Sequence, residues 1–593
     1  MILGIEPPKR LRKKSLLESL DSISPPLFAK VLEHLEDEEL RLACRTAGCD
    51  DSGTREKLKA RLLHRGETPP PSPPPASAKE NVVLPPVQET GTSHDPGKLQ
   101  RHLWAAANIL RGTVDSSDYR HYIFGLLFYK RLSDVWEEEY EARWLETGDE
   151  VLAADPWEHR FQIPRELLWN EVCGDQTPGI GVRLNDALRA IERAIPRLSG
   201  LFQDVDFAHR ERFPDATLER LVRHFEKVRL RHSDVPPDML GDAYEYLIKK
   251  FANDAGKKGG EFYTPKEVVQ LLVHCLDPQP GHSIYDPACG SGGMLLEAVA
   301  YVQRADGDAS TLQLYGQERN LNTWGICQMN LFLHDIENVS VRLGDTLRSP
   351  QHLDPSRGEM KIRQFDRVLA NPPFSLRSWG HEVWADGDPY GRNVFGCPPP
   401  HYGDLAFVQH MLESLRPDGM LGVVLPLGVL FRTGKEGKIR RGLLEEDLIE
   451  AVIGLPENLF YGTGIAASLL ILHRAKRPER QGKVLFVDGS KEMVAGKQQA
   501  KLSPENVERL CNTFRQYSEH EGFSRVVELS EIAAQGFSLL FKQYLATPET
   551  ESQQSVPELL AAIEEQMKVA ESSRQAFFEA VQELGYHIPR DRQ

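Results

Sequence analysis

The stretch "YDPACGSGGMLLEA", residues 285–298, follows a short apolar run and leads into a predicted helix. The run "HSIYD" has the aromatic and β-branched content of a short strand and ends at Asp286. The turn that follows is rich in residues that allow close approach of the backbone to a ligand: Gly290, Gly292 and Gly293. The helix predicted from Met294 presents its positive N-terminus at the same place. This order of elements predicts a ligand site at the C-terminal edge of an α/β sheet.

The residues ahead of the glycines restrict the ligand. A glycine-rich turn alone is compatible with NAD, with another nucleotide or with S-adenosylmethionine. This turn departs from the G-x-G-x-x-G pattern, and Asp286 and Pro287 come before its glycines. A carboxylate at that place would repel an anionic pyrophosphate but attract a sulfonium ligand that also has an ammonium group. The pattern therefore favours S-adenosylmethionine.

Short strand-like runs alternate with helical segments between about residues 240 and 474. The runs include "LQLYGQE", "VSVRLGD", "FDRVLANPPF", "GMLGVVLP", "IEAVIGLP" and "ASLLILHR". Such alternation predicts a Rossmann-like, mainly parallel sheet with helices on both faces. Sheets of this kind bind ligands at the C-terminal ends of their strands, so polar residues at those ends are the candidates for the site.

Two acidic residues stand at such strand ends. Glu318 closes "LQLYGQE", where a carboxylate can accept hydrogen bonds from two ribose hydroxyls. Asp345 closes "VSVRLGD", where it can accept from the amine of an adenine ring. Either acid alone is uninformative, because most carboxylates are simply solvated. In register with the glycine turn, the two predict the ribose and adenine contacts of the same ligand.

A fourth strand end reads "VLANPPF", residues 368–374. Proline cannot donate to a sheet ladder, so Pro372 and Pro373 end the strand and hold Asn371 at its tip. The Asn371 side-chain carbonyl and the Pro372 backbone carbonyl can both accept hydrogens of an exocyclic amine, which frees its lone pair. Phe374 can stack on a base that has rotated out of a duplex. A purely structural diproline turn is the alternative.

The stretch "KKGGEFYTPKEVVQLL" precedes the first of these strands. Thr264 suits a helix cap and Pro265 a first helical position. On its own this is an ordinary helix start.

Bulk properties bound the class of protein. The chain has 593 residues, 27% of them charged, and a net charge of −16, which argues against indiscriminate coating of nucleic acid. The eight scattered cysteines include no C-x-x-C pair and predict free thiols; no metal site is expected. No apolar run approaches the ~20 residues of a membrane span, and the basic N-terminal cluster reverses the order of a secretory signal. We therefore expect a cytoplasmic protein that does not enter a membrane.

Composition divides the chain into successive parts. The first contains "SPPLFAKVLEHL" and "DDSGTREKLKARLLHR", which resemble a SAP motif, a small DNA-binding helical module; a helical hairpin for protein docking is the alternative. The last has helical spacing that suits a docking arm or a packing helix. The predicted parts are a SAP-like module at 1–66, a proline-rich linker at 67–96, an all-α domain at 97–235, the catalytic domain at 236–480, a small α+β extension at 481–550 and C-terminal helices at 551–593.

Several longer motifs are similar to one family. In chain order they are "GGEFYTPKEVV", "DPACGSGGML", "NPPF", "DLAFVQHMLESLRPDGMLGVVLPLGVLF", "IEAVIGLPENLFYGTGI" and "FVDGSKEMVAGKQQAKLSPENVERL". Over roughly residues 98–587 the chain resembles the modification (M) subunit of type I restriction-modification systems, a DNA adenine N6-methyltransferase. The resemblance implies direct transfer of methyl from S-adenosylmethionine, with no covalent enzyme intermediate.

The resemblance also implies roles for individual residues. The methionine end of the cofactor would lie against Phe262, Tyr263, Thr264 and Pro265. The cofactor loop would consist of Asp286, Pro287, Ala288, Gly290 and Gly292, with Glu318 at the ribose and Asp345 at the adenine. The target adenine would be held by Asn371, Pro372, Pro373 and Phe374.

Partners follow from the same resemblance. It implies double-stranded DNA, a specificity (S) subunit, a restriction nuclease-translocase (R) subunit and two copies of this chain per complex. The SAP-like module and linker depart from the usual pattern, so a related phage-defence complex is also compatible. Two other functions stay open: the same fold acting on cytosine N4, an RNA amine or a protein amide, and a non-catalytic DNA-binding scaffold.

Overall fold

The computed structural model describes residues 95–110, 119–545, 568 and 571, with gaps at 156–157, 162, 175–178, 196–197, 204, 210, 255–263, 337, 461–463 and 495–499. The chain divides into two compact units, 1–88 and 89–593, and the described residues all belong to the second. The predicted SAP-like module, nearly all of the linker, Phe262, Tyr263 and the C-terminal arm, 568 and 571 excepted, lie outside the described residues. Within the described part, no helix combines the length and apolar character that a bilayer crossing requires.

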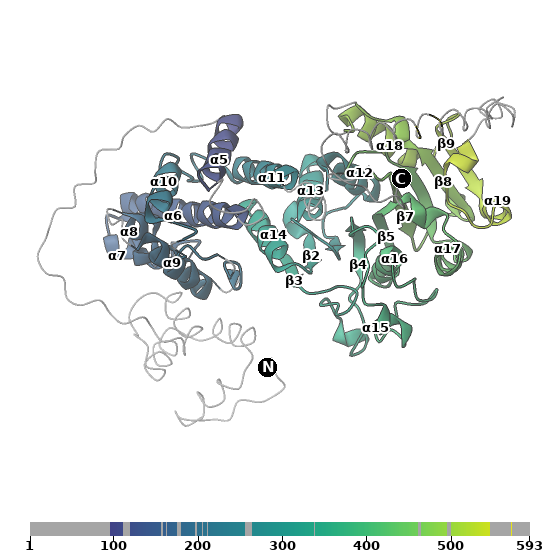
Figure 1. The fold of residues 1–593 in the computed structure, drawn as a ribbon, viewed down its shortest axis with the longest axis horizontal. Helices are drawn as coiled ribbons and strands as arrows, with labels where there is room; N and C mark the ends of the chain where they lie inside the picture. The colour runs from purple at the N-terminus through teal and green to yellow at the C-terminus, as the bar shows by residue number, and fades with distance from the viewer. Residues whose placement is uncertain are drawn as a thin grey trace, which may run out of the picture. The chain divides into compact units, whose positions relative to one another are not determined.

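The part that precedes the sheet is helical, as predicted (Figure 1). Its helices are α5 (Pro96–Leu110), α6 (Tyr119–Thr147), α7 (Glu150–Ala153), α8 (Trp169–Cys173), α9 (Ile180–Ala194), α10 (Asp215–Phe225) and α11 (Pro237–Asp254). The aromatic residues at the start of α6 are buried in their common core, including Phe124, Phe128 and Tyr129. They lie on the buried side of the helix and therefore contribute to packing.

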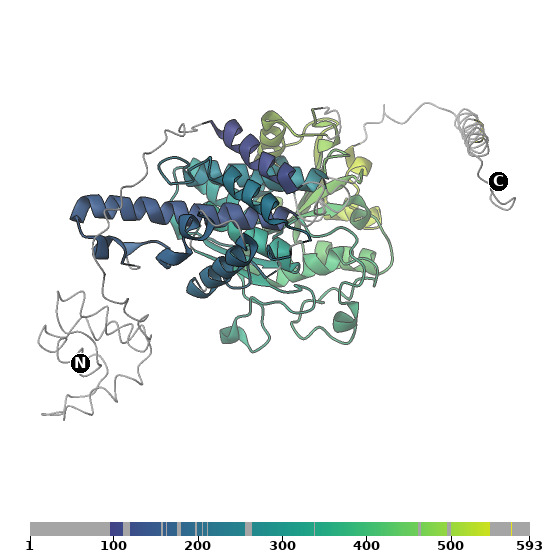
Figure 2. The same ribbon diagram turned by 60° about the vertical axis from the view of Figure 1, so that its left-hand side comes forward.

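A nine-stranded sheet follows, with the strand order β3-β2-β1-β4-β5-β7-β6-β8-β9. Figure 2 shows the ribbon from a second side, with helices packed around the strands. The strands are β1 (Ser283–Asp286), β2 (Gln313–Glu318), β3 (Val339–Leu343), β4 (Phe365–Ala370), β5 (Leu415–Pro426), β6 (Ile449–Gly454), β7 (Ala467–His473), β8 (Lys483–Asp488) and β9 (Ser524–Glu528). The run from β3 to β5 is parallel, and β8 is parallel to β6. The sheet is thus mainly parallel, as the sequence predicted, but β7 is antiparallel to both neighbours and β9 to β8.

Residues after 480 continue this sheet. β8 pairs with β6 along Ala451–Gly454, and β9 pairs with β8. A boundary at residue 480 therefore does not separate two sheets, although the predicted α+β content after it is present.

Helices cover both faces of the sheet, as predicted. One face packs against α12 (Lys266–Leu276), α13 (Gly293–Arg304), α14 (Leu321–Leu333) and α18 (Pro504–Gln516). The other packs against α16 (Asp404–Glu413), α17 (Lys435–Glu445), α19 (Leu529–Ala534) and α20 (Lys542–Leu545), while the short α15 (His381–Ala385) lies in the excursion after β4. Alternate strand residues serve the two faces: Ile284 packs with the first set and Tyr285 with the second.

Helix α14 takes part in two hydrophobic cores. Its residues Ile326, Met329 and Leu333 pack among the helices that precede the sheet. Cys327 and Leu331, on the opposite side of the same helix, pack against the sheet. The helical part and the sheet therefore share one helix, because α14 is apolar around most of its circumference.

Candidate functional site

The four predicted strand ends meet at one edge of the sheet. Strands β3, β2, β1 and β4 are neighbours and run parallel, so their C-terminal ends point the same way. Asp286 and Glu318 are the last residues of β1 and β2, Asn371 directly follows β4, and Asp345 is the second residue after β3. The topology therefore brings together residues that are up to 85 positions apart in the sequence.

The glycine turn after β1 is tied to its neighbours. The side chain of Asp286 accepts from the N–H of Ala288 at 2.9 Å, and the N–H of Gly290 donates to Glu318 Oε2 at 3.1 Å. Thr346 Oγ1 donates to the carbonyl of Pro287 at 2.6 Å. The turn is thus hydrogen-bonded both to Glu318 at the end of β2 and to Thr346 in the loop after β3. Gly292 has φ 84° at the N-cap of α13, which begins at Gly293, one residue before the predicted start.

Asp286, the first acid of this turn, has no positive partner among the described residues, whereas the positive charge of Arg319 acts on Glu318. Asp286 is buried, and burial raises its pKa to about 8; the Ala288 N–H lowers it in part, whereas the Glu318 carboxylate raises it further. Among the described residues, no cation contributes to this shift. Burial also raises the pKa of Glu318, although three backbone N–H groups counteract it. A cationic ligand would stabilise the ionised form of both acids.

Asp345 is positioned by its own loop and faces two arginines. Its Oδ1 accepts from the N–H groups of Leu347 at 3.1 Å and Arg348 at 3.2 Å. Its Oδ2 lies 3.5 Å from both Arg319 Nη1 and Arg348 Nε. The acid was predicted from the sequence, whereas the two arginines were not. A ligand amine at Asp345 would have to share the carboxylate with them.

Asn371 has one satisfied and one unsatisfied side-chain atom. Its Nδ2 donates to Thr264 Oγ1 at 2.9 Å. Its Oδ1 is buried and has no hydrogen-bond partner in the described structure. A buried acceptor without a partner is costly, which marks it as a position where a donor from a ligand is expected.

Thr264 does not have the structural role that the sequence predicted. The N-cap of α12 is Pro265, the helix begins at Lys266, and no side chain caps it. The prediction that Thr264 caps this helix and that Pro265 is its first residue is therefore wrong. The hydroxyl of Thr264 is used by Asn371 instead, 107 positions away, so no local pattern could reveal it.

The loop after Asn371 has two supporting residues that the sequence analysis missed. Phe374 is partly buried and packs edge-to-face against Phe460, with ring centroids 5.6 Å apart. The N–H of Ser375, whose φ is 50°, donates to Asp404 Oδ1 at 2.8 Å. Phe460 lies in "ENLFYGTGI", a family-like motif for which no chemistry had been assigned.

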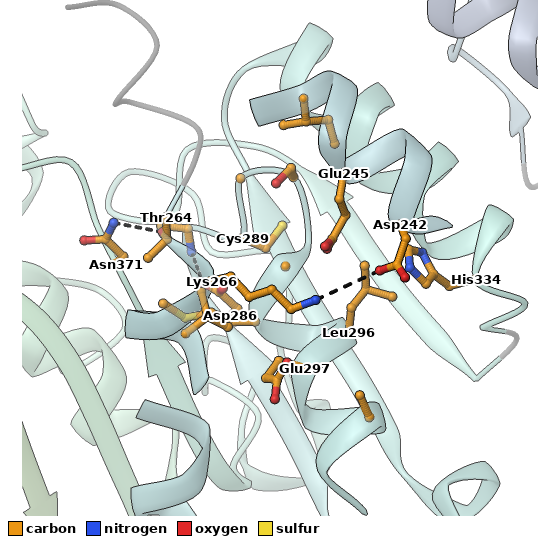
Figure 3. A pocket seen from close by; sticks show the side chains of 18 of the residues that line it. Asp242, Glu245, Thr264, Lys266, Asp286, Cys289, Leu296, Glu297, His334 and Asn371 are labelled. Atoms are coloured by element: carbon orange, nitrogen blue, oxygen red, sulfur yellow. Dashed lines mark hydrogen bonds and ion pairs between the residues drawn. The ribbon is translucent and has the colours of Figure 1, made fainter. Parts of the chain in front are cut away.

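A cavity of about 420 Å³ lies beside the glycine turn (Figure 3). Its walls include Asp286, Ala288, Cys289, Gly290 and Ser291 from the turn, together with Thr264 and Asn371. Helix α11 contributes Asp242, Glu245 and Ile248 to its walls, and α13 contributes Glu297 and Arg304. Glu318 and Asp345 lie at the adjacent strand ends and do not line it.

These features fit S-adenosylmethionine. The cavity joins a buried acid without a cation, Asp286, to a buried acceptor without a donor, Asn371 Oδ1. A ligand with a sulfonium and an ammonium group supplies positive charge at the first. A base amine supplies a donor at the second.

Comparison with known proteins agrees with this chemistry. A family model described as N-6 DNA Methylase matches residues 235–553, more than half of the chain. The chain belongs to this N-6 DNA methylase family. A second model, described as the HsdM N-terminal domain, matches residues 99–225 of the helical part.

Individual relatives of this methylase are similar over most of their length. The type I restriction enzyme MjaVII methylase subunit of Methanocaldococcus jannaschii is 34% identical over 473 residues, which are 75% of this chain and 77% of that protein. The MpnII methylase subunit of Mycoplasma pneumoniae is 29% identical, over 82% of this chain and 96% of that protein. A crystal structure of a type I restriction-modification methyltransferase subunit from Streptococcus thermophilus is 30% identical with a TM-score of 0.67, and the match covers 76% of this chain and 100% of that one. The predicted family, fold class and S-adenosylmethionine cofactor are confirmed.

Proposed function

We propose that this methylase transfers a methyl group from S-adenosylmethionine to the exocyclic N6 amine of an adenine that has rotated out of DNA. The observation that carries the proposal is Asn371 Oδ1, a buried acceptor without a partner at a strand end that borders the cofactor cavity. The target amine would donate one hydrogen to this oxygen.

The chain's own residues would prepare the amine for reaction. The lone pair of an adenine amine is delocalised into the ring, so the amine is a poor nucleophile. Asn371 Oδ1 and the Pro372 carbonyl would accept its two hydrogens and favour tetrahedral geometry at nitrogen, while Thr264 holds the amide in orientation. Phe374, supported by Phe460, would stack on the base. When bound, S-adenosylmethionine supplies the electrophilic methyl group.

The cofactor would be held by the neighbouring strand ends. Asp286 and the glycine turn would face its positively charged part, Glu318 would accept from the ribose hydroxyls, and Asp345 would accept from its adenine amine. The buried, cation-free environment of Asp286 supports the first assignment. The position of Glu318 and Asp345 at consecutive strand ends supports the other two.

We further propose that the chain acts as the modification subunit of a type I complex. The relatives are named as methylase subunits of type I restriction enzymes, which supports double-stranded DNA as substrate and specificity and restriction subunits as partners. We also predict two copies of this chain per complex, from the family resemblance, and a cytoplasmic location, from the sequence. The alternative acceptors are cytosine N4, an RNA amine and a protein amide, which the same Asn-Pro-Pro chemistry could serve. Identifying the methylated product distinguishes them from adenine N6.

The deciding experiment is a single-molecule methylome of the native host with the wild-type chain and with Asn371→Ala. The native host supplies whatever partners the chain needs. Loss of N6-methyladenine at a two-part DNA site in the variant would support the proposal and reveal the site. An adenine methylome that does not change would overturn it and direct attention to RNA and protein substrates.

A further inference from the structure

One wall of the cavity belongs to the helical part of the chain. Helix α11 contributes Asp242, Glu245 and Ile248 to this wall. Figure 3 shows the Glu245 carboxylate directed from α11 into the space beside Cys289. An acid from outside the sheet therefore enters the cavity that also contains Asp286.

Glu245 has no partner that accounts for its position. In the part of the chain that the structure describes, its carboxylate makes no hydrogen bond or ion pair. Burial raises its pKa, as do Asp242 and Glu297, whereas His334 and Lys266 lower it without contacting it. An unpaired acid in a cavity is destabilising because its carboxylate is partly desolvated. A cation of the ligand is the group expected to offset this destabilisation.

We propose that Glu245 binds the ammonium group of S-adenosylmethionine, so that the amino-acid end of the cofactor contacts α11 as well as the sheet. The proposal rests on the proposed function, because the sulfonium must face the target amine at Asn371. Figure 3 shows Asn371 at one side of the cavity and Glu245 and Asp242 at the other, so the amino-acid end would point from Asn371 toward α11.

The charge on the wall suits a zwitterion. Lys266, in the first turn of α12, also lines the cavity and lies 4.0 Å from Asp242. It supplies positive charge near the place where the carboxylate of the same amino-acid group would lie. An acid and a base within one cavity distinguish an amino-acid end from a simple amine.

The test measures ligand binding by calorimetry to the wild-type chain and to Glu245→Gln, which keeps the volume and hydrogen-bonding capacity but removes the charge. We expect the Kd of S-adenosylmethionine and of S-adenosylhomocysteine to rise about tenfold or more, the effect of losing a charge-assisted hydrogen bond. The Kd of 5′-methylthioadenosine, which lacks the amino-acid group, should stay unchanged.

Glu267→Gln is the matched control, because Glu267 lies in the first turn of α12 but does not line the cavity. It should leave all three Kd values unchanged. Equal weakening of all three ligands by Glu245→Gln would show a general effect on the pocket and overturn the inference, as would unchanged or tighter binding of S-adenosylmethionine. If the wild-type chain bound none of the ligands, the proposed function itself would fail, which is a separate result.

Discussion

Asn371 is the residue on which the proposed chemistry depends most directly. Its Oδ1 is the buried acceptor that awaits a donor, and it contacts no part of the glycine turn through a hydrogen bond. Asn371→Ala should therefore lower the rate of methyl transfer by at least about a hundredfold, a loss typical of removing one preorganised hydrogen-bonding group. Cofactor binding, measured by calorimetry, should be retained. Loss of cofactor binding in this variant would contradict the placement of Asn371 at the base.

Thr264 determines how the Asn371 amide is oriented. Its hydroxyl accepts from Asn371 Nδ2 at 2.9 Å, which leaves the carbonyl free for the substrate. Thr264→Val removes the acceptor and keeps the volume, so kcat should fall about tenfold or more because a misplaced group loses alignment with the reacting atom. Thr264→Ser should restore most of the rate. Steady-state kinetics check both, and a serine variant as slow as the valine variant would count against this role.

Asp286 gives a prediction for stability as a function of pH. Its pKa is raised in the folded chain from 3.8 to about 8, so the folded state binds more protons than the unfolded state between these values. Stability from this group is therefore greatest at low pH and is lost as the pH rises toward 8. Asp286→Asn cannot ionise and should raise the melting temperature of the cofactor-free protein at pH 8, with a smaller gain near pH 5. Thermal unfolding at both pH values checks this. A gain that does not depend on pH would contradict the burial argument.

The residues of the site could be predicted from sequence where they end strands. A strand end is recognisable locally, so Asp286, Glu318, Asp345 and Asn371 were all identified, and the structure places them at one edge. Their supporting contacts could not be predicted, because they join distant segments. For example, the N–H of Ser375 donates to Asp404, which is 29 positions away, and only tertiary packing brings the two together.

At the scale of elements, the junction of β1 and α13 depends on Gly292. Its φ is 84°, and a Cβ there would lie 2.9 Å from Cys327 Sγ on α14. Gly292→Ala should therefore destabilise the cofactor-free chain by at least about 1–2 kcal/mol, the cost of left-handed backbone for an L-residue. Thermal unfolding checks this.

Gly293 is the matched control for that substitution. It is the next residue, begins α13, and has open space where a Cβ would be. Gly293→Ala should leave the melting temperature unchanged or raise it, since alanine favours a helix by about 1 kcal/mol over glycine. If both substitutions changed the melting temperature equally, the left-handed backbone of Gly292 would not be what requires glycine there.

The order and direction of the strands could be predicted only in part. Buried strands in such a sheet are apolar on both faces, so a parallel and an antiparallel strand have the same pattern. β6 and β7 are both fully or almost fully buried, yet β7 lies antiparallel between β5 and β6. The reversal leaves no local signal, whereas the helix–strand alternation that predicts the fold class is local.

At the scale of the described chain, the helical part and the sheet are held together through α14. One side of α14 packs in the helical core and the other against the sheet. The proposed contact of Glu245 with the cofactor would add a second connection, because α11 lies against α14. Cofactor binding would then depend on the position of a helix that precedes the sheet.

Helix α11 comes close to His334, the C-cap residue of α14, at Gly241, and this contact gives a prediction whose sign is opposite to helix propensity. A Cβ at Gly241 would lie 2.2 Å from His334 Nε2, and that ring is hydrogen-bonded through Nδ1 to the carbonyl of Asn330 at 2.9 Å. Alanine would normally stabilise a helix interior by about 1 kcal/mol relative to glycine. Here Gly241→Ala should lower the melting temperature and weaken S-adenosylmethionine binding, because α11 must move away from α14. His334→Ala removes the ring that a Cβ at Gly241 would meet. In that background, adding Gly241→Ala should no longer lower the melting temperature or weaken S-adenosylmethionine binding. A stabilising effect of Gly241→Ala by itself would mean that the two helices are not in close contact and that α11 does not fix the cofactor wall.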